Sequence, residues 1–188
     1  MTTEIAFGTA SAFPLDTGDT ILIRVGQGNQ AGDLSFPGFD QALSRDINGI
    51  AHFGRPVLPY HATEGMGLYD GEGEPVMIVG PVSGEGGNDI MLPGCRREIY
   101  EDGRLGCRDL IAAALNLERS QLTGMLSFFA IGVAGESYFD GLAGTSAGPG
   151  ASCSFTAVRP LTVAVSACPG TDIPGFEPGT LIVEVWAG

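Results

Sequence analysis

Glycine and proline occur so often in this sequence that few long helices can form. The 188 residues include 30 glycines and 12 prolines, spread along the whole chain. Glycine adopts turn conformations that other residues avoid, and proline interrupts helices and central strands. We therefore expect an α+β, β-dominated fold, with many short strands arranged as a sandwich or barrel. The length suits one domain and no linker is present, so residues 1–188 are expected to form a single compact domain.

Six short segments rich in Val, Ile and Thr have the composition of strands. They are Thr20–Val25, Pro75–Gly80, Met125–Val133, Ser152–Val158, Leu161–Ala167 and Thr180–Trp186. In the last segment Leu181, Val183 and Val185 share one face, which predicts one side better covered than the other. Pro160 limits the link between the fourth and fifth segments to a turn, so these two are expected to form a hairpin.

One main helix is expected near residues 108–117, where the sequence reads RDLIAAALNL. Leu110, Ala113, Ala114 and Leu117 form a stripe at helical spacing. Cys107 then lies at the entrance of the helix. Residues 38–67 show little periodicity of either kind, so they are expected to be an irregular surface or a loop over the site.

The charge of the chain excludes some partners. A net charge of −13 repels phosphate backbones and anionic lipids, so neither nucleic acid nor membrane is an expected partner. No signal peptide or membrane span is recognisable, and the protein is expected in the cytoplasm. The chain has no lysine, and four of its arginines, Arg96, Arg97, Arg104 and Arg108, lie in one short segment. They could hold an anionic substrate or pair with neighbouring acids on a helix surface.

Cysteines and carboxylates carry most of the chemistry that the sequence offers. A carboxylate, two sulfurs and a phenol occur within twenty residues, at Asp89, Cys95, Tyr100 and Cys107. Cys168 follows a predicted strand and precedes a Pro-Gly turn, where side chains often reach a site. In a reducing compartment these thiols are expected as metal ligands, nucleophiles or buried residues rather than disulfides. Cys153 lies inside a predicted strand and is expected to be a small core residue.

Two chemistries remain open for these cysteines. Converging thiolates would suit zinc, although Cys95 and Cys107 lack the usual close spacing of a metal-ligand pair. A cysteine at a helix start near arginines could instead be a nucleophile with a depressed pKa. Its base could be His52, His61, Asp33 or Asp89. The histidines could equally be surface residues, and Asp33 could cap a turn.

Taken in order, several segments resemble the urea carboxylase-associated family. They are GNQAGDL at 28–34, which contains Gln30, then PVMIVG, NDIMLPGC, GCRDL and the C-terminal run that ends in SACP and TDIPG. The resemblance implies a cytoplasmic enzyme of small nitrogen compounds, in which paired paralogues act as a carboxyguanidine deiminase that releases ammonia. It also implies a bound metal, with zinc as the expected ion, and Asp89, Cys95 and Cys107 match the family's metal-binding pattern.

This chain departs from the family pattern at two histidines. Asn88 and Arg104 stand where the family has imidazoles, so either Cys95, Cys107 and Cys168 hold the metal with another group or the metal is lost. We expect metal-assisted hydrolysis of a C–N bond in a small polar substrate. Asp89, Asp33 and Cys95 are the expected catalytic residues, and Asn88, Arg104, Tyr100 and Gln30 are expected to bind substrate. A cysteine-dependent enzyme, or a non-catalytic subunit joined to a paralogue or to copies of itself, are the alternatives.

Overall fold

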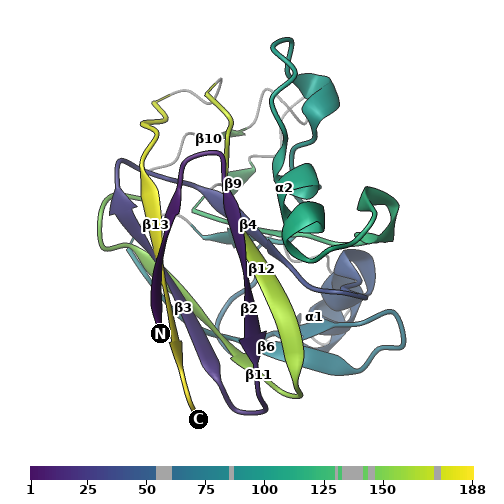
Figure 1. The fold of residues 1–188 in the computed structure, drawn as a ribbon. Helices are drawn as coiled ribbons and strands as arrows, with labels where there is room; N and C mark the ends of the chain where they lie inside the picture. The colour runs from purple at the N-terminus through teal and green to yellow at the C-terminus, as the bar shows by residue number, and fades with distance from the viewer. Residues whose placement is uncertain (54–60, 85–86, 130, 133–141, 144–146, 172–174) are drawn as a thin grey trace.

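Two antiparallel sheets form the fold of this chain in the computed structural model (Figure 1). The structure describes residues 1–53, 61–84, 87–129, 131–132, 142–143, 147–171 and 175–188. The six-stranded sheet has the order β1 (Thr2–Ala6), β13 (Thr180–Trp186), β3 (Thr20–Gln27), β11 (Ser152–Ala157), β6 (Pro75–Ser83) and β5 (Gly67–Tyr69). The five-stranded sheet has the order β2 (Ala10–Leu15), β12 (Leu161–Ala167), β4 (Gly32–Ser35), β8 (Leu126–Phe128) and β7 (Asn88–Asp89). A small ribbon joins β9 (Ile131–Gly132) to β10 (Leu142–Ala143).

The main core lies between the two sheets. Alternate residues of β3 point inward, and Ile21, Ile23 and Val25 are fully buried there. From the other sheet, Leu34 and Val165 join the same apolar cluster. Period-2 alternation therefore gives each sheet one apolar face, and burying both faces against each other stabilises the sandwich. The expected β-dominated α+β fold is confirmed.

The strand predictions agree with the structure, with one correction in the pairing. β12 and β13 have the expected bounds, and Leu181 and Val183 are buried as the alternation indicated. The expected hairpin of β11 with β12 is wrong. β11 pairs with β3 and β6, whereas β12 pairs with β2 and β4, so the short turn before Pro160 leads from one sheet to the other. The segment predicted as one strand from Met125 is divided after β8 at Phe129, whose φ of 60° ends the extended backbone.

The expected helix is α2 (Cys107–Ala114), and it packs on β2, β12 and β4. Cys107 is its first residue, as expected. Its buried face differs from the prediction, because Cys107, Ile111 and Ala112 are buried while Ala113 is exposed. Because Cys107 belongs to the buried face, this face is rotated around the helix axis relative to the predicted apolar stripe. Two single turns of 3₁₀ helix, Arg97–Ile99 and Arg119–Gln121, lie before and after α2.

A second helix, α1 (Gln41–Phe53), lies within the segment expected to be irregular. Its buried face is polar. Ser44 and Asn48 are fully buried, and Asn48 both donates to the carbonyl of Gly67 and accepts from its N–H, at 2.7 and 3.0 Å. These bonds satisfy backbone groups of β5, while Ile50 is 61% exposed. Neither of the two described helices is long and apolar enough to cross a membrane.

Candidate metal centre

A row of buried polar side chains crosses the five-stranded sheet on the face opposite the main core. Ser166 of β12 pairs with Asp33 of β4, Asp33 pairs with Ser127 of β8, and Ser127 pairs with Asp89 of β7. Residues paired across antiparallel strands point to the same face, so these four side chains share one side of the sheet. Helix α2 covers this side. The polar row is therefore enclosed between the sheet and the segments that carry the cysteines.

Three cysteines from three different segments meet above this row. Cys95 lies in the loop before α2, Cys107 begins α2, and Cys168 directly follows β12. Their Sγ atoms all lie within 4.8 Å of one another. The N–H of Cys107 donates to Sγ of Cys95 at 3.0 Å, and the N–H of Gly170 donates to Sγ of Cys168 at 3.4 Å. Three soft donors at this separation can hold a metal ion.

The thiols of this cluster differ in acidity. Hydrogen bonds from the thiols of Cys107 and Cys168 lower the pKa of Cys95 far below its ordinary value, and the hydroxyl of Tyr100 adds to the effect. Burial raises the pKa of Cys107 well above its ordinary value. One negative charge therefore resides on Cys95 and is stabilised by its neighbours. A cation would complete the site by replacing the protons that the other two thiols retain.

Asp33 lies beside the cluster, on the sheet. Its carboxylate accepts a hydrogen bond from the hydroxyl of Ser127. Burial raises the pKa of Asp33 to about 7, and the negative charge of Cys95 acts in the same direction, while the thiol of Cys107 and the hydroxyl of Ser127 oppose the rise. A carboxyl group with such a pKa both takes up and releases protons near neutral pH.

Tyr100 and Arg104 border the cluster on the side of the loop. Burial and the charge of Cys95 raise the pKa of Tyr100, so its hydroxyl stays protonated and serves as a donor. The guanidinium of Arg104 lies 4.8 Å from the centre of the Tyr100 ring. It also donates to the carbonyl of Pro169 and to the hydroxyl of Thr171, both at 2.9 Å. Arg104 thus ties the loop after Cys95 to the loop after Cys168.

Other expected site residues support the backbone around the cluster. Asp89 accepts from the N–H groups of Met91 and Leu92, at 2.6 and 2.9 Å, and so shapes the turn that leads toward Cys95. The fully buried amide of Gln30 donates to the carbonyl of Cys168 at 3.0 Å, which fixes the end of β12. Both residues act here on backbone groups.

Asn88 lies on the side of the sheet opposite to the polar row. It pairs with Phe128, so its side chain shares the core-facing side, whereas Asp89 shares the side of the polar row. Its amide donates to the carbonyl of Ala62 at 3.5 Å. Asn88 therefore does not share the side of the polar row, and its expected contact with substrate stays a prediction.

The remaining cysteine and the two histidines do not belong to the group of three clustered sulfurs. Cys153 of β11 is fully buried in the main core, and burial raises its pKa, as expected of a core residue. His61 forms an isolated bridge with Asp89 and is half-buried rather than exposed. His52 lies in α1. Ser127 was not foreseen, and its only signal in the sequence is a hydroxyl among apolar residues.

Comparisons with known proteins indicate the fold. No family model matches this sequence, and no curated protein matches it. Among solved structures, the chain is similar to a DUF1989 family protein from Silicibacter pomeroyi DSS-3, with a TM-score of 0.78 and 18% identity. The match covers 100% of this chain and 77% of that protein. At this identity the likeness shows that the two chains share a fold.

Proposed function

We propose that this chain is an enzyme that hydrolyses a C–N bond in a small nitrogen-rich substrate with the aid of zinc. The observation that carries the proposal is the convergence of three Sγ atoms within 4.8 Å, next to the buried carboxyl group of Asp33. Three protein ligands with an open fourth position are typical of catalytic zinc, whereas structural zinc has four. The sequence resemblance to the urea carboxylase-associated family supports the choice of substrate class.

The donor set fits zinc better than harder cations. Thiolates are soft ligands that favour zinc, and magnesium or calcium would require oxygen donors instead. The N–H groups of Cys107 and Gly170 donate to two of the sulfurs and hold them in orientation. A bound zinc ion would supply Lewis acidity, which draws electrons from the C=O or C=N group of the substrate and makes its carbon easier to attack.

In this proposal, Asp33 moves the proton. Its carboxyl group lies on the sheet below the thiols, and the hydroxyl of Ser127 orients it. Hydrolysis requires a group that takes a proton from water and returns it to the leaving nitrogen. Tyr100 stays protonated and donates a hydrogen bond toward Cys95, so it supports the charge of the centre and leaves proton transfer to Asp33.

Metal content is the first test. We expect about one equivalent of zinc in protein purified without added metal, because three thiolates bind zinc tightly. Cys168→Ser should weaken zinc binding at least about tenfold, since it removes one ligand. Cys153→Ser is the matched control, because that thiol is buried in the main core and is not one of the three clustered sulfurs. Less than about a tenth of an equivalent in the unmodified protein would contradict the proposal.

Activity is the second test. Ammonia release is measured with guanidino, ureido and amide compounds of low molecular weight. Asp33→Asn should abolish release while zinc content is retained, because the amide no longer exchanges a proton. Turnover by the isolated chain would also exclude the alternative of a non-catalytic subunit. An active Asp33→Asn variant would contradict the role of this carboxyl group.

A direct nucleophilic role for Cys95 is the second candidate. Two observations favour it: the lowered pKa of this half-buried thiol, and the hydrogen bond that its sulfur accepts from the N–H of Cys107 at the start of α2. In that case iodoacetamide inactivates the enzyme by labelling Cys95, and chelators leave activity unchanged. Loss of activity on chelation, restored by zinc, decides for the metal-assisted reaction.

A further inference from the structure

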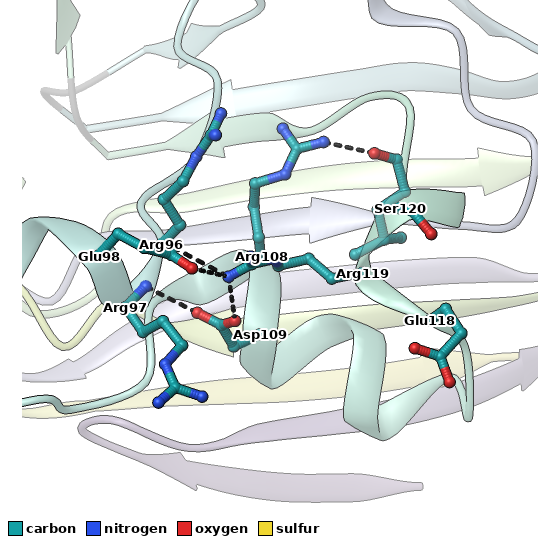
Figure 2. Close-up of a pocket in the computed structure, with 9 residues that line it drawn as sticks. Arg96, Arg97, Glu98, Arg108, Asp109, Glu118, Arg119 and Ser120 are labelled. Atoms are coloured by element: carbon teal, nitrogen blue, oxygen red, sulfur yellow. Dashed lines mark hydrogen bonds and ion pairs between the residues drawn. The ribbon is translucent and has the colours of Figure 1, made fainter.

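An open pocket of about 730 Å³ lies beside the segments that carry Cys95 and Cys107 (Figure 2). Most of its lining side chains are charged. They are Arg96, Arg97, Glu98, Arg108, Asp109, Glu118, Arg119, Ser120 and Leu122. Four of the nine basic residues of the chain thus gather at one place, in a protein whose net charge is −13. The positive charge of these four arginines is opposite in sign to the net charge of the chain.

Two of the acids in this pocket are already engaged, and both contact Arg119. Its guanidinium forms ion pairs with Glu98 at 2.7 Å and with Asp109 at 2.9 Å. Asp109 also accepts from the backbone N–H groups of Arg97 and Gly106. Figure 2 shows the contacts of Asp109 with Arg119 and with the N–H of Arg97, and that of Glu98 with Arg119, close together. The carboxylates of Glu98 and Asp109 are therefore committed to Arg119, and Glu118, the third acid of the lining, forms no ion pair among the described residues.

Arg96 and Arg108 form the positive side of the pocket. Arg108 donates to the carbonyl oxygens of Pro93 and Leu122, which are neutral acceptors. It forms no ion pair within the described part of the chain, although the charges of Asp33 and Asp109 act on it. Arg96 is exposed and has no ion pair among the residues that the structure describes. Figure 2 shows the two side chains extending in the same direction, whereas Arg97 extends to the opposite side. Two like charges on the same side of the pocket repel each other, and a bound anion would relieve this repulsion.

We propose that Arg96 and Arg108 bind a small oxyanion, with a carboxylate or phosphate group between their guanidinium groups. Each guanidinium has five N–H donors in a fixed planar arrangement that matches the oxygens of such groups. Arg108 uses only part of its donors on the two carbonyls. The hydroxyl of Ser120, which also lines the pocket, is a further polar group for the ligand.

This site is separate from the thiol centre, although the same two backbone segments carry both. Arg96 directly follows Cys95, and Arg108 directly follows Cys107. The N–H of Arg108 donates to the carbonyl of Cys95 at 3.0 Å, so these two segments are joined. The inference concerns a second ligand and does not depend on the metal or on the reaction proposed above.

The test is calorimetric titration of the full chain with inorganic phosphate and, separately, with malonate, at constant ionic strength. We expect binding of at least one anion, and Arg96→Gln should weaken it tenfold or more. Arg97→Gln is the matched control, since it removes the same charge from the opposite side, and it should change affinity less than twofold. The tighter of the two anions identifies the ligand as a phosphate or a carboxylate.

Three results would overturn the inference. One is the absence of binding of either anion to the unmodified chain, and another is an equal loss in Arg96→Gln and Arg97→Gln, which would indicate a diffuse charge effect. The third is binding that disappears after chelator treatment but survives Arg96→Gln, because the anion would then bind at the thiol centre. Urea unfolding of each variant verifies that the fold is retained.

Discussion

Gly106 offers the sharpest test of how the thiol centre is held together. It lies at the N-terminal boundary of α2, and its φ of −85° suits any residue, so alanine introduces no backbone strain there. A Cβ at this position would meet three backbone atoms, Cα and N of Arg96 and O of Cys95, at 2.4, 2.5 and 2.5 Å. No side-chain rotation can relieve these contacts. The segment with Cys95 and the helix with Cys107 must therefore move apart.

The expected size of the effect follows from these distances. Ordinary contact begins at 3.4 Å, so the closest pair must separate by about 1 Å (3.4 − 2.4). Two hydrogen bonds across the same gap, from the N–H groups of Cys107 and Arg108 to Cys95, are 3.0 Å long and would be lost or weakened. Overpacking costs about 1–3 kcal/mol and each hydrogen bond about 1 kcal/mol. We expect Gly106→Ala to lower the free energy of unfolding by about 3–5 kcal/mol when both bonds are lost.

Urea unfolding and cobalt titration measure the two consequences. Gly71→Ala is the matched control, because a Cβ there meets nothing within 4 Å, and its stability should change by less than about 0.5 kcal/mol. Cobalt bound by thiolates gives a visible charge-transfer band, which should be weakened in Gly106→Ala and unchanged in Gly71→Ala. If Gly106→Ala has the stability and cobalt affinity of the unmodified protein, the explanation of the centre by close backbone packing is wrong.

Two further predictions concern the supporting structure. The guanidinium of Arg159, which donates to Asp70 at 2.6 Å, holds the pKa of Asp70 below its usual range. The carboxylate therefore stabilises the fold at neutral pH, and this stabilisation is lost as pH falls through its folded-state pKa. In urea unfolding, the difference in stability between the unmodified protein and Asp70→Asn should shrink below about pH 4. Asn48→Ala leaves the N–H and carbonyl of Gly67 buried without partners and should cost about 2–4 kcal/mol, whereas Ile50→Ala, on the exposed side of α1, should change stability by less than about 0.5 kcal/mol.

The sequence predicts the strands well because alternation and turn residues are local signals. β12 and β13 agree with their predicted bounds, since each buries alternate or continuous apolar residues. Helix α1 was missed because its buried face carries Ser44 and Asn48, which bond to β5, so the usual apolar stripe is absent. The pairing of β11 was missed because a short turn alone does not determine whether the next strand stays in the same sheet.

The site was predictable only in part. Cys95, Cys107 and Asp33 were identified by residue type, but their proximity depends on the packing of α2 against the sheet. Cys168 joins them because β12 pairs with β4, which carries Asp33. That pairing links segments more than a hundred residues apart, and no spacing rule in the sequence reveals it. Asp89 and Gln30, for which the sequence predicts catalysis and substrate binding, form hydrogen bonds with backbone groups near the thiols, which no pattern in the sequence reveals.

Arg104 shows how the centre can be organised without the imidazole that the family resemblance leads one to expect at this position. Its guanidinium contacts the ring of Tyr100, whose hydroxyl donates to Cys95, and it bonds to Pro169 and Thr171 beyond Cys168. A metal ligand at this point would join the two loops through the ion. Arginine joins them directly, and this contact helps to hold Cys168 near the other thiols. Arg104 therefore brings together the two loops that follow Cys95 and Cys168.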